Sequence, residues 1–205
     1  MSAHPFSTLV VGDIGVNCYL VPGPHSGNLY IIDPGDDAGD IIAAAERLDC
    51  RGETVILLTH AHVDHIGACG AVAKKLGISK VCVNSADAPL YSSPENHLLP
   101  YLPPAKNLPP VMDYFPQEDF SVIETPGHTP GSVCLWFRDY NVLFTGDTLF
   151  QGSVGRTDLP GGDYDTLMHS IREKLLLLPE DLKIFPGHQS WSSIGREKNG
   201  NPFLV

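Results

Sequence analysis

The sequence predicts an α/β (α+β) fold in which two β-sheets pack face to face and carry helices on their outer faces. Short apolar runs of strand type alternate with longer segments of helical periodicity along the chain. The two halves, roughly 1–110 and 111–205, have a loosely similar order of strands and then a βα unit, which favours a two-sheet sandwich. A chain of 205 residues fits a single domain, 1–205, that buries a sizeable core.

The first half is predicted to contain strands followed by βα units. Helices are expected over 40–48, where an acidic residue precedes apolar positions at helical spacing, and over about 64–76, which is rich in Ala and Lys. Strands are expected in apolar runs bounded by Gly, Pro, Asp or Asn, at 8–15, 18–23, 28–35, 53–59 and 80–84.

The stretch 84–116 differs from the rest of the chain because it is rich in proline. Eight of the 18 prolines fall here, with Tyr91, Tyr101 and Tyr114 between them. Proline fixes φ and removes a backbone donor, so little regular structure is expected. Two interpretations stay open: a well-packed surface connection, or a wall or lid over a binding site.

The second half returns to strands and then a helix. Strands are predicted over 120–125, 133–138, 141–147 and 182–187. A Gly-rich loop is expected over 151–162, and a helix over about 164–177.

Composition excludes several classes of partner. Asp and Glu outnumber Lys and Arg by 24 to 13, for a net charge of −11, and no basic run occurs, which argues against nucleic acid. The five cysteines are scattered, odd in number and without a CxxC pair, which favours reduced thiols in the cytoplasm. The N-terminus shows no export signal, and no apolar run is long enough to cross a bilayer, so no membrane association is expected.

Histidines and aspartates follow four of the predicted strands. Because strand ends on one edge of an α/β sheet converge, these side chains are expected to meet. Five of the nine histidines and two aspartates take part, whereas His4, His25, His97 and His169 lack such a context. The candidate metal ligands are His60, His62, Asp64, His65, His128, Asp147 and His188.

The spacing of these residues predicts two metal ions. His60 and His62 point to the same side of an extended segment and can serve one ion, while Asp64 and His65, at the turn into a helix, can serve another. Asp64 is also placed to cap that helix, and the two oxygens of Asp147 can bridge two ions. Imidazole and carboxylate without cysteine favour Zn²⁺, with Fe or Mn as alternatives.

Such a pair of ions predicts hydrolysis. Hydrolytic two-metal sites hold a water whose pKa falls to about 7, and this hydroxide is the expected nucleophile, with Asp64 and Asp147 as catalytic carboxylates. No GxSxG motif for a serine nucleophile is present. A structural zinc site, the non-catalytic alternative, is closed by four ligands that often include cysteine.

At these residues the chain resembles the metallo-β-lactamase superfamily. The match comprises HxHxDH at 60–65, then His128, Gly146-Asp147 and Gly187-His188, in the same order across nearly the whole chain. The resemblance implies the four-layer αββα sandwich. It also implies one metal on His60, His62 and His128, a second on Asp64, His65 and His188, a bridging Asp147, and support of the site by Asp33.

Within that superfamily the chain is most similar to the glyoxalase II group, the hydroxyacylglutathione hydrolases. The segments THAHVDHIG, TPGHTPGS, TGDTLF and the loop 155–158 carry this similarity. Only 17 residues follow His188, whereas full-length members add a helical domain that contacts glutathione. Arg156 and Asp158 are candidate substrate contacts: Arg156 keeps a cation for an anionic substrate, and Asp158 would repel one. Arg196 and Lys198 are either solvated charges of the tail or replacements for that domain.

The favoured function is hydrolysis of a small-molecule thioester of the S-acylglutathione type in the cytoplasm. The alternatives are an iron-dependent persulfide dioxygenase, with His60 or His62, His128 and Asp147 around one iron, and hydrolysis of another ester or lactone. β-Lactam hydrolysis is less favoured because such enzymes are exported. The sequence leaves the oligomeric state open and is compatible with a monomer.

Overall fold

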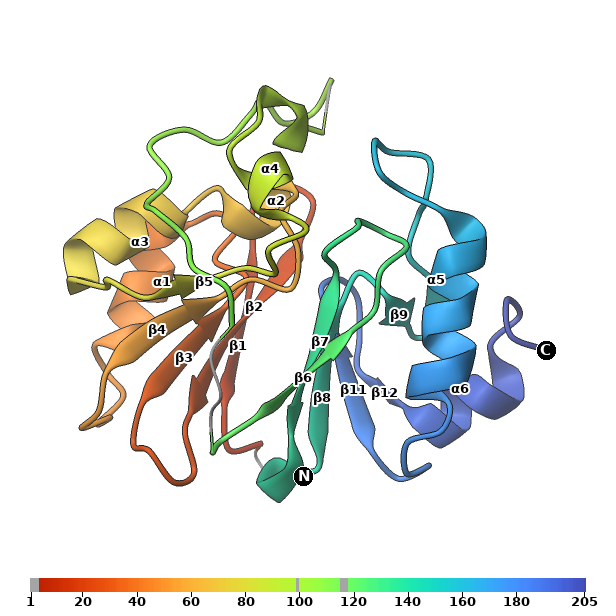
Figure 1. The fold of residues 1–205 in the computed structure, drawn as a ribbon. Helices are drawn as coiled ribbons and strands as arrows, with labels where there is room; N and C mark the ends of the chain where they lie inside the picture. The colour runs from red at the N-terminus through yellow and green to blue at the C-terminus, as the bar shows by residue number, and fades with distance from the viewer. Residues whose placement is uncertain (1–3, 99, 115–117) are drawn as a thin grey trace.

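The computed structural model describes residues 4–98, 100–114 and 118–205, and it confirms the predicted α/β fold. Two five-stranded sheets face each other, and helices cover their outer faces (Figure 1). The strands of one sheet come from the first half of the chain and those of the other from the second half.

The first sheet has the strand order β1-β2-β3-β4-β5. Its first three strands are antiparallel neighbours, and β3, β4 and β5 are parallel. Helices α1 (Ala38–Ala45) and α3 (Cys69–Leu76) lie on its outer face. The strands are β1 (Ser7–Val11), β2 (Val16–Pro22), β3 (Leu29–Ile32), β4 (Thr54–Leu57) and β5 (Val81–Cys82).

The second sheet has the order β12-β11-β8-β7-β6. Helices α5 (Tyr164–Ser170) and α6 (Ile194–Gly200) cover it, and a small hairpin of β9 (Leu149–Phe150) and β10 (Ser153–Val154) lies beside it. The strands are β6 (Ser121–Glu124), β7 (Val133–Phe137), β8 (Val142–Gly146), β11 (Lys183–Pro186) and β12 (Ser192–Ser193).

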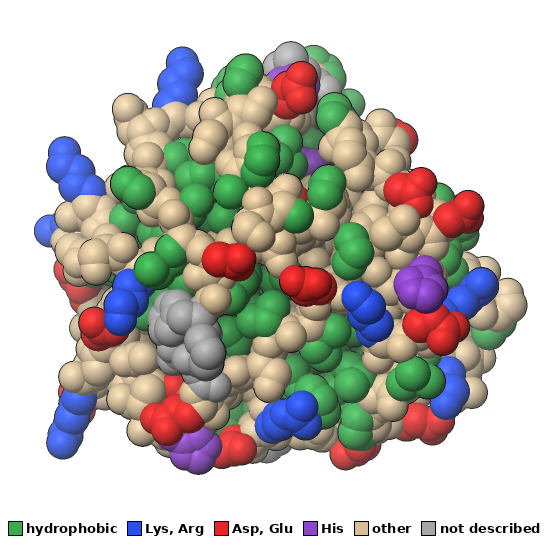
Figure 2. All heavy atoms as spheres, viewed as in Figure 1, with side chains coloured by type: hydrophobic (Ala, Val, Ile, Leu, Met, Phe, Trp, Pro, Cys, Tyr) green, Lys and Arg blue, Asp and Glu red, His purple; other side chains and the backbone are tan. Residues whose placement is uncertain are grey.

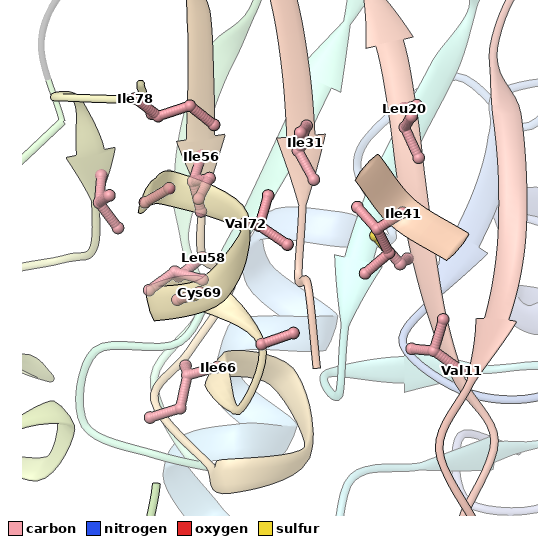
Figure 3. Close-up of a cluster of buried hydrophobic side chains, with 14 of the residues drawn as sticks. Val11, Leu20, Ile31, Ile41, Ile56, Leu58, Ile66, Cys69, Val72 and Ile78 are labelled. Carbon is pink, nitrogen blue, oxygen red and sulfur yellow. The ribbon is translucent and has the colours of Figure 1, made fainter. Parts of the chain in front are cut away.

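The core has three layers of apolar side chains because both faces of each sheet are covered. In β3, Ile31 faces the outer helices while Tyr30 and Ile32 face the other sheet, as the alternation of a strand requires. Figure 3 shows the outer layer, where Val72 of α3 faces Ile31. Full burial of one such side chain stabilises the fold by about 1.5–3 kcal/mol.

Two predicted helices differ from the structure. The helix expected over 64–76 is two helices, α2 (Val63–Ile66) and α3, because the amide of Ala68 donates to the carbonyl of Pro34 at 3.0 Å instead of continuing the helix. The helix expected over 164–177 is α5 followed by a π-helical turn, Ile171–Leu175. The C-terminal segment, expected to be a tail, forms β12 and α6.

The proline-rich stretch contains more structure than expected. Helix α4 (Ala88–Tyr91) and a 3-10 turn (Pro94–Asn96) each have a proline in their first turn, where no backbone donor is needed. Residues 99, 115 and 116 of this stretch lie outside the described residues, as do residues 1–3 of the N-terminus in which no export signal is expected.

On one face of the molecule, charged side chains of both signs are dispersed. Figure 2 shows Lys and Arg scattered among Asp and Glu over the described part of one face. Among the described residues, no helix has both the length and the apolarity needed to span a bilayer.

Candidate metal centre

Four loops and the short helix α2, at one edge of the two sheets, bring together all seven predicted ligands. Strands β6 and β8 are each antiparallel to β7, and β11 is parallel to β8, so their C-terminal ends lie at the same edge. The loop after β4 and the helix α2 that follows it reach this edge from the first sheet; α2 is labelled in Figure 1. The loops carry His60 and His62, then Asp64 and His65 on α2, His128 after β6, Asp147 after β8, and His188 after β11.

Three buried imidazoles form the first group. Nε2 of His128 lies 3.2 Å from Nε2 of His60 and 2.9 Å from Nδ1 of His62. His62 has extended backbone angles, φ −73° and ψ 149°, so it shares a side of the chain with His60. Nδ1 of His128 is held by the carbonyl of Arg156 at 2.7 Å, which leaves its Nε2 lone pair directed at the other two rings.

The second group consists of Asp64, His65 and His188. Oδ2 of Asp64 lies 3.2 Å from Nε2 of His188 and 3.5 Å from Nε2 of His65. The predicted capping role of Asp64 is wrong: His62 is the N-cap residue of α2, no side chain caps it, and the Asp64 carboxylate faces the histidines instead.

Asp147 lies between the two groups. Its Oδ1 is 3.5 Å from Nε2 of His65, and its Oδ2 is 3.6 Å from Nε2 of His188 and 3.7 Å from Nε2 of His128. Oδ2 of Asp147 therefore faces a histidine of each group, while Oδ1 faces only the second group, so the carboxylate lies within reach of both.

The donor set fits divalent metal binding. Among the described residues, Oδ1 of Asp64, Nε2 of His65 and Oδ1 of Asp147 are buried without a hydrogen-bond partner. Buried polar atoms are nearly always paired, and these three converge with imidazole nitrogens whose lone pairs face one another. Cations would pair with all of them at once, and nitrogen with carboxylate oxygen suits Zn²⁺, Fe or Mn.

The surroundings of the histidines shift their pKa values in opposite directions. Burial and neighbouring histidines lower the pKa of His60 well below 6.5 and that of His62 to about 3, so both rings are neutral and available as ligands. Burial alone would lower the pKa of His65, but the carboxylates of Asp64, Asp147 and Asp33 raise it well above 6.5. His65 therefore lies in the most anionic part of the site, which also favours a cation.

Asp33 holds the second group in place. Its Oδ2 lies 2.9 Å from Nδ1 of His65 and accepts a hydrogen bond of 2.7 Å from Oγ1 of Thr59, while its Oδ1 accepts from the Thr59 amide at 2.8 Å. These contacts orient the His65 ring and bind it to the end of β4. Gly35, in the same Asp-Pro-Gly turn, must be a glycine for steric reasons, because a Cβ at this position would lie 1.5 Å from the carbonyl oxygen of Asp64.

Asp87 is a further residue of the site that the sequence did not indicate. Its fully buried carboxylate accepts hydrogen bonds from the Ala61 amide at 3.0 Å, Oγ1 of Thr129 at 2.8 Å and the Gly131 amide at 2.6 Å. It therefore ties the loop of His60 and His62 to the loop of His128. The only signal in the sequence is an aspartate shortly before a proline, which is more typical of a turn.

Arg156 and Asp158 interact with each other instead of presenting separate charges. Nε and Nη2 of Arg156 donate to Oδ1 and Oδ2 of Asp158, each at 2.7 Å, and both side chains are more than half exposed. This pairing lowers the pKa of Asp158 to about 2, raises the pKa of Arg156, and places a carboxylate against the Arg156 cation. The expected repulsion of an anionic substrate by Asp158 is thus offset by its partner.

A cleft of about 330 Å³ opens onto the cluster. His62, Asp64, His128, Asp147 and His188 line its floor. Its walls are largely apolar and include Ile14, Leu98, Phe150, Val154 and Leu159. Leu98 comes from the proline-rich stretch, which favours the interpretation of that stretch as a wall of the site.

The fold and this donor set are those of a known class of metalloprotein. A model of the metallo-beta-lactamase superfamily matches residues 11–188, and the chain belongs to that superfamily. The predicted metallo-β-lactamase-type sandwich is confirmed by solved structures. The crystal structure of BLEG-1 B3 metallo-beta-lactamase matches with a TM-score of 0.86 at 37% identity, over 98% of this chain and 99% of the other.

Two further relatives bear on the activity and the metal. The chain is 40% identical to a hydroxyacylglutathione hydrolase, GloC, of Haemophilus influenzae, over 92% of each protein. It is 34% identical to TTHA1623, crystallised in a di-iron-bound form, with a TM-score of 0.84 over 97% of this chain and 100% of the other. Together with the superfamily, the first of these relatives supports a hydrolase, and the second supports divalent metal binding by the cluster.

Proposed function

We propose that the protein is a thioester hydrolase of the glyoxalase II type that acts on S-acylglutathione substrates and uses two divalent cations, with Zn²⁺ favoured. The observation that carries the proposal is the cluster of three imidazoles and a second group of two imidazoles and a carboxylate, with Asp147 between them. The 40% sequence identity to a hydroxyacylglutathione hydrolase supports S-acylglutathione as the proposed substrate class.

The roles of the residues follow from their places. His60, His62 and His128 would hold one cation, Asp64, His65 and His188 the other, and Asp147 both. Bound there, the cations would polarise the thioester carbonyl and lower the pKa of a water to about 7. Asp33 fixes the His65 ring through its Nδ1.

A thioester suits this cleft because a thiolate is a good leaving group and needs no separate proton donor. Thiols have a pKa near 8.5, so a thiolate departs without a proton from a dedicated acid. The described titratable residues of the cleft floor are all candidate ligands, and the other titratable side chain that lines the cleft is the paired Arg156. The apolar walls, including Phe150 and Leu159, exclude water from the scissile bond and leave room for a small acyl group.

The proposal is tested by metal analysis and a substrate panel. Protein as isolated is expected to contain about two equivalents of metal, and chelation should abolish activity that Zn²⁺ restores. The loaded protein should hydrolyse S-lactoylglutathione, and Asp147→Ala should lose activity together with metal. As a control, Asp49→Asn changes an exposed aspartate that belongs neither to the cluster nor to the lining of the cleft. Absence of turnover of every glutathione thioester by fully loaded protein would refute the proposal.

Two other chemistries are separated by the same panel. A persulfide dioxygenase would use one iron on His60 or His62, His128 and Asp147, and the iron-bound relative makes iron worth loading. Oxygen uptake on glutathione persulfide, without thioester turnover, would favour it. Hydrolysis of a β-lactam is suggested by the name of one solved relative, and a chromogenic cephalosporin measures it directly. A cytoplasmic location forms part of the leading proposal.

A further inference from the structure

A second cavity, of about 390 Å³, shares lining residues with the cleft that opens onto the ligand cluster, which we call the metal cleft. We call it the carrier groove; it lies between the turn that joins β1 to β2 and the segment 102–106. Its lining also includes Gly35, Asp36, Val63, Asp64 and Gly67. Ile14 and Asp64 line both the carrier groove and the metal cleft. The side chain of Ile14 is 40% exposed at the tip of the turn, so an apolar residue stands where the two cavities meet.

The carrier groove combines an apolar wall with separate charges of both signs. Val11, Val16, Leu102 and Pro104 contribute apolar surface, and Asp13, Asp36 and Lys106 are exposed along it. The cation of Lys106 forms no ion pair within the described residues, and neither does the carboxylate of Asp13. The charges of Lys106 and Asp13 are thus available to a ligand, whereas Oδ1 of Asp36 already accepts a hydrogen bond of 2.7 Å from the Asp37 amide.

The metal cleft offers a poorer site for the charged part of a substrate. Its one guanidinium, Arg156, is engaged by Asp158 through two hydrogen bonds. Its volume of about 330 Å³ lies near the lower limit of ligand sites and would be shared with two cations and the acyl group. A peptide-sized thiol carrier therefore needs additional space next to the cleft.

We propose that the carrier groove binds the peptide part of a glutathione-type thiol carrier, an inference that rests on the proposed function. Glutathione bears one ammonium group and two carboxylates on an extended backbone. Lys106 would pair with a carboxylate of glutathione, and Asp13 or Asp36 would pair with its ammonium group. Ile14 would contact the glutathione backbone where it passes from the groove toward the metals. The groove, and not Arg156, then determines which thiol carrier is accepted.

The first experiment measures binding without turnover. S-Methylglutathione is a thioether that cannot be hydrolysed, and its affinity for metal-loaded protein is measurable by calorimetry. Lys106→Met is expected to weaken binding about fivefold and Lys106→Glu more, because an exposed charge contact is lost or reversed. The matched control is Lys75→Met, on the exposed side of α3 and outside both cavities. Failure to bind at about 10 mM, or equal affinity of both Lys106 variants and wild type, would overturn the proposal.

The second experiment separates this inference from the proposed function. With a lactoyl thioester of glutathione, Lys106→Met should raise KM about fivefold and leave kcat unchanged. With the lactoyl thioester of a small neutral thiol, the same variant should match wild type. Binding of S-methylglutathione that is weakened in the Lys106 variants, without hydrolysis of any thioester, refutes the function and leaves the groove supported. Normal hydrolysis with identical KM in wild type and both Lys106 variants refutes the groove and leaves the function.

Discussion

Oγ1 of Thr129 donates a hydrogen bond of 2.8 Å to Oδ2 of Asp87, and the same oxygen accepts from the backbone between His60 and His62. One buried carboxylate thus fixes two loops that come from different sheets. These hydrogen bonds therefore help to fix the relative placement of His60, His62 and His128.

Asp87→Asn is expected to weaken metal binding as well as stability. The amide keeps one acceptor oxygen but turns an NH₂ group toward a donor, which should cost about 1–3 kcal/mol of unfolding free energy. Misplaced imidazoles should lower the affinity for the first metal about tenfold, measured by competition with a chromophoric chelator. Asp49→Asn serves as the control. A stability loss with wild-type metal affinity would show that Asp87 does not position the ligands.

The pair of Arg156 and Asp158 predicts an increase in affinity when its acidic member is removed. Asp158→Asn frees the guanidinium at the cleft and should lower KM for an anionic glutathione thioester about two- to fivefold at low ionic strength, less at high salt. The double change Arg156→Met/Asp158→Asn keeps the net charge and should leave KM within about twofold of wild type. A large rise in KM in the double variant would mean that the paired Arg156 already binds substrate.

Glu197 is expected to stabilise the C-terminal helix and one wall of the cleft together. Its buried carboxylate accepts from the Gly152 amide at 2.7 Å and from Nδ2 of Asn201 at 2.9 Å, and it bonds Ser192. Glu197→Ala leaves these donors unpaired and should cost about 1–3 kcal/mol, measured by urea denaturation. Because Gly152 joins β9 to β10, whose residues line the cleft, KM should rise as well. Glu173→Ala, at an exposed position, should change neither quantity.

Acid sensitivity should depend on Asp119, away from the metals. Burial alone would raise its pKa, but hydrogen bonds from Ser26, the His25 amide and Tyr30 lower it below 3.8. A lowered carboxyl pKa adds stability above the unfolded-state pKa of about 3.9, and this stability is lost as the pH falls through the native value. Asp119→Asn should therefore lose less stability than wild type between about pH 5 and pH 3, followed by chemical denaturation. Parallel losses would show that other carboxylates dominate.

Much of the metal centre could be predicted because its ligands follow strands directly. The apolar runs before His60, His128, Asp147 and His188 indicate strands, and strand ends in an α/β fold are expected to converge at one edge. The split between α2 and α3 could not be predicted in this way. It depends on the carbonyl of Pro34, which is far from Ala68 in sequence, and no local pattern reports such a contact.

By itself the sequence determined the fold class, the four strand-to-loop junctions and the set of candidate ligands, since these depend on short-range patterns of apolar, turn and ligand residues. Only the tertiary structure decided that Asp87 joins two ligand loops, that Glu197 holds one wall of the cleft, and that Arg156 is paired with Asp158. It also placed Lys106 in the groove next to the metal cleft. The physical reason is that a buried carboxylate or an available cation is defined by its surroundings. Those surroundings come from segments that meet only after the two sheets have packed together.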